Sequence, residues 1–352
     1  MFQLINLLKN PAGWLTTQGE FSDYALSSRV RLARNLTGHR YPHAAGGKEL
    51  SLVLGQTFEA LRKTREMGRA AYLKLSDLDD VDLAFLVERH LISADLTQKT
   101  QNRAVVVGDK ELASLMVNEE DHVRLQAIYP GLELFRALDA ALVLDQNLSR
   151  LLPYAYHEEF GFLTSCPTNI GTGLRASCLV HLPALAQTQA IGPVFQELSR
   201  AGLAVRGFYG EGSNVYGDLF QISNATTIGK SEAEFVATIS NILKSLFKHE
   251  SEVRSKMFKG SEGAKIVDKI WRTYGALGQC RFISYAETMR YLSLLRLGLT
   301  AKILTGRVSL EDVNRLIIMT QPAHIQMQAG RTLNPAERDE FRATLVRQAL
   351  KN

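Results

Sequence analysis

Cysteine is scarce in this sequence, and long apolar runs are lacking. Only three of the 352 residues are cysteine, at Cys166, Cys178 and Cys280, and no two stand in CxxC spacing. The pattern predicts neither a disulfide framework nor a zinc site, and no other motif for a protein-bound metal is evident. No stretch approaches the roughly 18 uninterrupted apolar residues that a membrane span needs. Residues 1–14 are too short and wrongly flanked for a signal peptide, so we expect a cytoplasmic protein.

Internal repeats, low-complexity tracts and recognised DNA-reading motifs are also lacking, so we expect no direct binding of nucleic acid. Hydrophobic residues make up 45% of the chain and charged residues 22%, the balance of a globular protein with a substantial core. The net charge of +5 is unevenly distributed, because residues 253–352 carry 17 Lys and Arg against 8 Asp and Glu. This basic third is typical of a surface that attracts acidic or phosphorylated groups, and equally of a solvated surface without a partner.

The first 250 residues mix strand and helix patterns. Apolar and β-branched runs between turn formers predict strands at Arg103–Gly108, Leu115–Val117, Ala141–Leu144, Leu203–Arg206 and Leu219–Ser223. A capping box of Ser231 and Glu234 begins a helix, and the spacing of its apolar residues carries it to about Glu250.

Strand patterns largely stop after Glu250. A polar, glycine-containing connector, KMFKGSEG, occupies residues 256–263. Helix-capping residues, each followed by an acid three positions later, then predict helices from Ser284 to Leu299, from Ser309 and from Asn334. We therefore place a domain boundary near residues 252–260, which divides the chain into a mixed α/β domain at 1–252 and a helical domain at 253–352.

Two motifs combine charge with a strand pattern. In SSRVRLARN, Arg29 and Arg31 alternate, so on a strand they point to one face and can grip phosphate oxygens. A solvated basic strand face would give the same pattern. The segment NEEDHVR, at residues 118–124, sets three acids between an apolar run and Arg124. Adjacent acids raise one another's pKa unless a cation neutralises them, and the alternative is a solvated turn where a strand leaves its core.

A third motif, FLTSCPTNIGTGLRAS at residues 162–177, is a glycine-rich turn that we expect to lead into a helix from about Leu174, including Arg175. Backbone amides at such a turn and helix start favour anions, although the Walker A signature is missing. Cys166 enters the turn where neighbouring arginines could lower its thiol pKa, and a buried packing residue is the alternative. The other two cysteines fit core positions on helical faces.

The fourth motif, RGFYGEGSN at residues 206–214, places Arg206 at a strand end and Glu211 among glycines. Flexible backbone around one acid is typical of a substrate-contacting loop and also of an ordinary hairpin. Each motif alone is explained by its structural alternative, but the combination of all four is not.

Together the four motifs resemble the phosphagen (guanidino) kinase family, whose members transfer a phosphoryl group from ATP to a guanidino group. SSRVR, NEEDH, CPTNxGTxxR and RGxxGE occur in the order found in that family, and the match covers residues 24–250. The resemblance implies an α+β catalytic domain with a mainly antiparallel sheet flanked by helices. A smaller all-helical C-terminal domain follows it here.

The resemblance also implies functional residues. Its ATP-binding positions are Ser27, Ser28, Arg29, Val30, Arg31, His90, Arg124, Arg175, Ala176, Ser177, Cys178, Leu179, Arg206, Gly207, Phe208, Tyr209, Gly210 and Glu211. The five arginines in this set would clamp the ATP phosphates, and the histidine would lie near the base. Glu120 and Glu211 would hold the acceptor guanidinium beside the thiol of Cys166, with Glu120 as the base. Phosphates and water would supply most ligands of Mg²⁺.

Two departures from the family pattern indicate a branch. SSRVR begins at Ser27, so the helical N-terminal domain of small-molecule guanidino kinases is expected to be absent, and a basic helical region follows the catalytic part. Both features resemble bacterial protein-arginine kinases, which carry an RDxxRA motif that binds phosphoarginine. Arg338, Asp339 and Arg342 match it, with the two arginines on one helix face. The alternative is a surface ion pair between Asp339 and Arg342.

This branch implies proteins bearing arginine as substrates, among them a heat-shock repressor. It also implies an activator protein, the Clp chaperone–protease machinery as a partner, a stress-response role and a homodimer formed through the helical region. One alternative is a kinase of a free guanidino metabolite, against which the missing N-terminal domain argues. The other is a non-catalytic phosphoarginine-binding adaptor, against which the intact set of two glutamates and five arginines argues.

Overall fold

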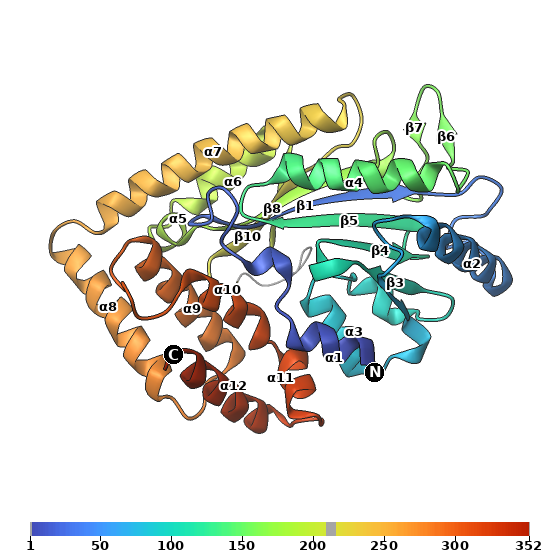
Figure 1. Ribbon diagram of the computed structural model, residues 1–352. Helices are drawn as coiled ribbons and strands as arrows, with labels where there is room; N and C mark the ends of the chain where they lie inside the picture. Colours follow the sequence, from blue (N-terminus) through green and yellow to red (C-terminus); the bar gives the residue numbers. More distant parts are fainter. Residues whose placement is uncertain (1, 209–215, 352) are drawn as a thin grey trace.

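The computed structural model describes residues 2–208 and 216–351. They form an α+β protein in which one large sheet separates two groups of helices (Figure 1). The sheet consists of β1 (Ala25–Arg34), β2 (Ala71–Lys74), β3 (Ala104–Val107), β4 (Ala113–Val117), β5 (Val123–Pro130), β8 (Leu174–His181), β9 (Leu203–Gly207) and β10 (Leu219–Asn224). A separate hairpin pairs β6 (Tyr156–His157) with β7 (Gly161–Phe162).

The α-helices are α1 (Phe2–Lys9), α2 (Gly47–Lys63), α3 (Asp80–Glu88), α4 (Leu134–Ser149), α5 (Pro183–Gln187), α6 (Ile191–Arg200), α7 (Glu232–Met257), α8 (Gly260–Gln279), α9 (Tyr285–Thr300), α10 (Leu310–Met319), α11 (Pro322–Ala329) and α12 (Pro335–Ala349). Short 3-10 helices are η1 (Gly13–Leu15), η2 (Leu75–Asp77), η3 (Asp95–Gln98), η4 (Asp109–Glu111) and η5 (Pro167–Asn169). No α-helix within the described ranges is both long and apolar enough to span a membrane.

The sheet is antiparallel throughout the described strand pairs, in the order β2-β3-β4-β5-β1-β8-β10-β9. Successive side chains on β1 point to opposite faces. Val30 and Leu32 are fully buried against the helices of one face, where α4 and α7 run along the sheet (Figure 1). Arg29 and Arg31 therefore point to the other face, as their spacing predicts.

A third arginine of β1, Arg34, points into the buried layer beneath α4. Its guanidinium forms hydrogen bonds with both carboxylate oxygens of Asp145 at 2.7–3.1 Å, and it lies 3.5 Å from the ring centre of Phe162. The arginine side chain is 1% exposed and the aspartate side chain 9%. The pair fixes α4 to the middle of the sheet. Arg34 therefore has a structural role, unlike Arg29 and Arg31 on the opposite face.

The helices after residue 260 form the second group, α8 to α12, and cover part of the face opposite α4 and α7 (Figure 1). Their core includes Leu292 and Leu295 of α9, which pack in one cluster with Leu26 of β1 and Leu179 of β8. The helical group and the sheet therefore share buried apolar surface, which is the main source of their attachment.

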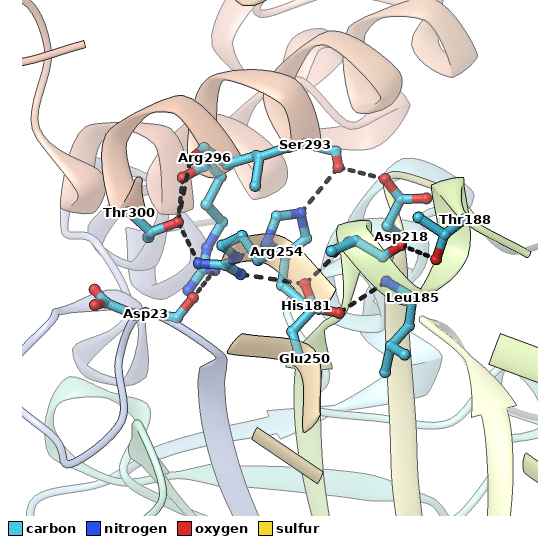
Figure 2. A network of polar contacts seen from close by, with 12 residues as sticks. Asp23, His181, Leu185, Thr188, Asp218, Glu250, Arg254, Ser293, Arg296 and Thr300 are labelled. Atoms are coloured by element: carbon cyan, nitrogen blue, oxygen red, sulfur yellow. Dashed lines mark hydrogen bonds and ion pairs between the residues drawn. The ribbon is translucent and has the colours of Figure 1, made fainter. Parts of the chain in front are cut away.

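A buried polar network strengthens this attachment (Figure 2). Arg296 of α9 is fully buried and donates to the carbonyls of Ser22 and Asp23, just before β1, at 2.5 and 2.9 Å. Its guanidinium also lies 3.1 Å from Nδ1 of His181, at the end of β8. Because an arginine can only donate, this ring nitrogen must accept, and the proton of the neutral ring sits on Nε2.

That Nε2 lies 2.9 Å from the hydroxyl of Ser293, which in turn donates to Asp218 at 2.6 Å. Burial, followed by the charges of Arg296 and Arg254, lowers the pKa of His181 well below its ordinary value and keeps the ring neutral. The network thus joins α9 to the chain at the ends of three strands, β1, β8 and β10. These strands carry most of the candidate phosphate-binding side chains.

Several predicted elements are confirmed and two are wrong. Strands at β3, β4, β9 and β10 and the capped helices α7, α9, α10 and α12 occur where the sequence places them. The predicted strand Ala141–Leu144 instead belongs to α4, because its buried residues recur three or four apart from Leu134 to Leu148. The predicted helix from Leu174 is strand β8, since it is hydrogen-bonded between β1 and β10 in the centre of the sheet.

The predicted connector at residues 256–263 is also shorter than expected. Helix α7 continues past Glu250 to Met257, and α8 begins at Gly260, which has φ 66°. Only Phe258 and Lys259 separate the two helices. Residue 252 therefore lies inside a continuous helix.

Candidate active site

A cavity of about 370 Å³ opens on the arginine-bearing face of the sheet. Strand register explains why residues far apart in sequence line it. Arg31 pairs with Gln126 of β5 on one side and with Arg175 of β8 on the other, and paired residues point to the same face. Farther along the same face, Gln221 of β10 pairs with Leu179 of β8 and with Arg206 of β9. All of these side chains except that of Leu179 line the cavity.

Four arginines that line this cavity lie close enough to one another for their charges to interact. Arg29, Arg31, Arg124 and Arg175 all line it, and no ion pair with Arg29 or Arg31 occurs among residues 2–208 and 216–351. Burial, followed by the charges of Arg175 and Arg124, lowers the pKa of Arg29 to about 10. Burial and three neighbouring arginines lower the pKa of Arg31 well below its usual value. The group is electrostatically strained and suited to a multiply charged anion.

The acidic motif forms the turn between β4 and β5, where the sequence places it. Glu119 is almost fully buried; it accepts a hydrogen bond from the Ser93 hydroxyl at 2.5 Å and forms an ion pair with Arg124. Burial, the largest single effect, would raise the pKa of Glu119. The charge of Arg124, the hydrogen bonds from Ser93 and a backbone N–H, and the charge of Arg31 together outweigh burial, so the pKa is lowered. Glu119 therefore favours its anionic form and holds Arg124 in place.

Glu120, the next residue, is different. Its carboxylate lies 3.1 Å from Arg124, but its side chain is 40% exposed and faces the cavity. Burial raises its pKa, helped by the charges of Asp121 and Glu119 and opposed by Arg124. A carboxylate with a raised pKa at a cavity wall is suited to accepting a proton.

Asp121 and His122 complete this turn as buried structural residues. Asp121 accepts from the Asn35 amide at 2.7 Å and from the Ser165 backbone N–H at 2.8 Å. The hydroxyl of Ser165 donates to the carbonyl of Glu120 at 2.6 Å. The turn is therefore bonded to the segment that carries Cys166.

Cys166 lies at the start of η5 and lines the same cavity as Glu120. Its Sγ is 3.0 Å from Oγ1 of Thr168, and its side chain is partly exposed. The thiol therefore stands at the cavity surface and is no packing residue of the core. Cys178, by contrast, is fully buried on β8, where burial raises its pKa to about 12, and Cys280 is partly buried at the end of α8.

His90 forms a wall of the cavity between Trp14 of η1 and Phe208 at the end of β9, with ring centres 5.6 and 5.0 Å apart. Burial and the charges of Arg29 and Arg31 lower its pKa to about 3, so the ring is neutral. An aromatic, uncharged wall beside a cluster of cations is suited to a nucleotide base next to its phosphates.

The two residues before His90 are anchored in different directions. Glu88 accepts from the backbone N–H groups of Ala323 and His324 at the start of α11, at 2.8 and 2.9 Å, and from the His324 ring at 2.7 Å. Arg89 forms a buried ion pair with Glu111 and also donates to a backbone carbonyl after α1. The cavity wall at His90 is thus continuous with contacts to the helical region.

Other positions implied by the resemblance fall elsewhere. Val30, Ala176 and Cys178 face the opposite, apolar side of the sheet. Ser27, Ser177, Leu179 and Phe208 line a small recess next to the cavity, and Ser28 donates to the Gly131 carbonyl and Gly207 ends β9. Tyr209, Gly210 and Glu211 lie outside the described residues.

Sequence reasoning missed several cavity residues. They are Ser93, Glu119, Gln126, Thr168, Asn169, Gln221 and Ser223. Most are neutral polar residues on strands or loops, and their position depends on strand register rather than on a local pattern. Glu119 stands next to Glu120 in sequence, and only the different burial of the two side chains separates their roles.

The C-terminal motif lies on α12. Arg342 is 1% exposed; it donates to the carbonyls of Thr320 and Ile283 at 2.9 Å each and pairs with Asp339 at 2.5 Å. The ion pair expected as the alternative is present, but the arginine is buried rather than on the surface. Arg338 is half-buried and donates to the Leu333 carbonyl at 3.2 Å. Arg338 and Asp339 are the accessible members of the motif.

Comparison with known proteins agrees with this geometry. Residues 53–253 match the family model of the ATP:guanido phosphotransferase C-terminal catalytic domain. The fold is similar to lombricine kinase, with a TM-score of 0.58 and 24% identity over 71% of each chain. It is also similar to the duplicated taurocyamine kinase of Schistosoma mansoni, with a TM-score of 0.62 and 21% identity over 70% of this chain and 35% of that one. The chain belongs to the ATP:guanido phosphotransferase family, whose members use ATP.

Residues 263–352 match a second model, the protein-arginine kinase McsB C-terminal domain. The chain is 43% identical to the protein-arginine kinase of Geobacillus thermodenitrificans over 97% of this chain and 94% of the relative. It is 40% identical to that of Bacillus subtilis over 96% and 93%. Within the family, the chain belongs to the protein-arginine kinase branch.

Proposed function

We propose that this enzyme transfers the γ-phosphoryl group of ATP to arginine side chains in proteins, with the cavity as its active site. The observation that carries the proposal is the meeting of four arginines, Glu120 and Cys166 in one cavity. A cluster of cations together with a carboxylate and a thiol in one cavity matches the two reactants of guanidino phosphorylation, a polyanion and a planar cation.

The arginines are assigned to the nucleotide. Arg29, Arg31, Arg124, Arg175 and Arg206 would bind phosphate oxygens and offset the charge that develops during transfer. His90 would lie near the base. Mg²⁺ is assigned to the nucleotide as well, with phosphate oxygens and water as its main ligands, because both carboxylates near the cluster are engaged by Arg124.

Glu120 is assigned to the acceptor. A guanidinium is a poor nucleophile because it is protonated at neutral pH. A carboxylate can hold its planar group and orient one nitrogen toward the γ-phosphorus, and can accept the proton as the N–P bond forms. The raised pKa of Glu120 supports this role. Glu211 is proposed as the second carboxylate and Cys166 as a neighbour of the guanidinium, on the resemblance of their motifs.

Membership of the protein-arginine kinase branch also suggests roles for the two parts of the chain and for the C-terminal motif. We assign residues 1–252 to catalysis and 253–352 to regulation and homodimer formation. Phosphoarginine would bind at Arg338 and Asp339, with Arg342 holding the aspartate in place. A heat-shock repressor as substrate, an activator protein and delivery of tagged proteins to a Clp protease are proposed as the cellular setting, supported by the match of the C-terminal region.

The test is mass spectrometry of an unstructured protein after incubation with the enzyme and Mg-ATP, under conditions that preserve acid-labile phosphate. We expect phosphate on arginine, and a loss of at least about 100-fold in rate for Glu120→Ala, because general-base catalysis contributes roughly 10²–10⁴. Nucleotide binding by this variant should persist. Phosphate found only on Ser, Thr or Tyr would refute the proposal.

A further inference from the structure

A second cavity of about 650 Å³ lies between the α3–η3 segment and the N-terminal ends of α9 and α11. Its walls include Leu83, Ala84 and Val87 of α3, Ala94 before η3, Tyr285 of α9 and Pro322 of α11. Val87 and Ala94 also line the active-site cavity, so the two cavities adjoin along this segment. The second cavity therefore lies directly beside the active site.

The second cavity begins near the acceptor side of the active site. Ala94 directly follows Ser93, whose hydroxyl is bonded to Glu119 at 2.5 Å. Glu119 shares Arg124 with Glu120, the carboxylate assigned to the acceptor. If the acceptor arginine of a substrate polypeptide is held at Glu120, the residues a few positions away from it in that polypeptide would lie at the opening of the second cavity.

The chemistry of the walls fits a polypeptide. Leu83, Ala84 and Pro322 offer apolar surface, and volumes of about 300–1,000 Å³ are typical of ligand sites. The only charged residues that line the cavity within the described ranges are acids, Asp80 and Glu88, and Asp95 lines the adjoining active site next to Ala94. Cationic and apolar side chains would be favoured there, and acidic ones disfavoured.

Hydrogen bonds between the surrounding helices fix the positions of the cavity walls. Glu88 on α3 accepts three hydrogen bonds from the start of α11 and is 8% exposed. On the other side, the Gln321 amide donates to the Ile317 carbonyl at 2.9 Å and to the Tyr285 hydroxyl at 3.2 Å. A groove whose width is set by buried bonds loses little free energy in ordering itself on binding.

We propose that this cavity is a docking groove for the stretch of substrate polypeptide next to the acceptor arginine, and that it selects apolar and basic flanking residues. The inference rests on the proposed function, since only an arginine within a polypeptide has a chain to dock. The groove gives the helical region a share in substrate selection, because α9 and α11 form one of its walls.

Ala84 offers a direct test, because it is exposed on α3, lines the groove and lies outside the active-site cavity. Ala84→Trp fills the groove, and Ala264→Trp on α8, at another exposed alanine, is the matched control. Two acceptors are compared, an unstructured protein and a single arginine blocked at both ends. We expect Ala84→Trp to lower kcat/KM for the protein at least tenfold, with KM for ATP and the rate on blocked arginine within twofold of the unchanged enzyme.

Equal losses on both acceptors, or no loss on the protein, would overturn the proposal. A change in oligomeric state by light scattering would do so as well, because a second copy of this chain would then occupy the groove. Photo-crosslinking gives a second measurement that does not depend on turnover of blocked arginine. A benzoylphenylalanine at position 84 should crosslink to residues flanking arginine in a bound peptide, and crosslinks only elsewhere would contradict docking. Failure of the proposed function is distinguishable, because the unaltered enzyme would then phosphorylate no arginine.

Discussion

Replacing Arg29 by methionine is expected to stabilise the protein in the absence of nucleotide and to weaken nucleotide binding at the same time. Arg29 shares the cavity with three other arginines, and no ion pair with it occurs among the described residues. Methionine has a similar length, fits the space and removes the charge. The two effects have opposite signs, which makes the prediction sharp.

The magnitude follows from the pKa. Burial and the neighbouring arginines lower it from the ordinary value of an arginine to about 10, and each unit corresponds to about 1.4 kcal/mol. Because the folded value is the lower one, the fold disfavours the charged form. This penalty is fully present at pH 7 and fades only as pH rises through about 10 toward the ordinary value of an arginine. Water in the cavity screens part of it, so we expect a gain of about 1–3 kcal/mol in the free energy of unfolding.

The assay is urea unfolding at pH 7 with and without Mg-ADP. A ligand at 100 times its Kd adds about 2.7 kcal/mol to the stability of a protein that binds it. The unaltered protein should show such a gain, and Arg29→Met should lose most of it. Arg65→Met, at an exposed arginine, should change neither value. If Arg29→Met were less stable than the unaltered protein without nucleotide, the cations would be contributing favourably and the reasoning would be wrong.

Four further predictions concern single charged or titratable residues. Asp145→Asn leaves a buried arginine without its counter-ion and should cost about 3 kcal/mol in urea unfolding, whereas Asp139→Asn, exposed on the same helix, should cost nothing measurable. Arg342→Met should lower the stability of the protein by about 2–4 kcal/mol by leaving two carbonyls unpaired. Arg338→Met should keep stability and abolish binding of a phosphoarginine peptide in calorimetry; unchanged binding would remove Arg338 from the site. His90, with a folded pKa of about 3, is neutral in the fold while the unfolded ring takes up a proton below pH 6.5, so stability falls as pH drops. His90→Gln should reduce the loss between pH 7 and pH 5 by up to about 2 kcal/mol in urea unfolding, and an unchanged pH slope would contradict the shifted pKa.

Local patterns in the sequence were sufficient for the residues that lie next to one another on one strand or at one turn. Alternation on β1 predicts that Arg29 and Arg31 share a face, and the acidic run predicts the turn that carries Glu120. Caps predict the starts of α7, α9, α10 and α12 because side chain and backbone satisfy each other within four residues.

Properties set by distant partners could not be predicted in the same way. Strand β8 is predicted as a helix because a glycine-rich turn precedes it, and only pairing with β1 and β10 selects the strand. Glu119 and Glu120 are equivalent in sequence, and the hydroxyl of Ser93 and the burial around it distinguish them. Arg342 is buried because its guanidinium binds two backbone carbonyls from distant parts of the chain, Thr320 just after α10 and Ile283 just before α9.

The run Glu88, Arg89 and His90 has a consequence for how such a protein can evolve. Glu88 is bonded to α11 and Arg89 to the N-terminal segment. His90 lines the active-site cavity and has a left-handed backbone conformation with φ 60°. Because these residues are adjacent in the backbone, a displacement of any one of the three regions that they contact would shift the other two residues. A gene rearrangement that exchanged the helical region for an unrelated one would therefore disturb the cavity wall itself. A change in the helical region is therefore expected to require a compensating change in the catalytic part.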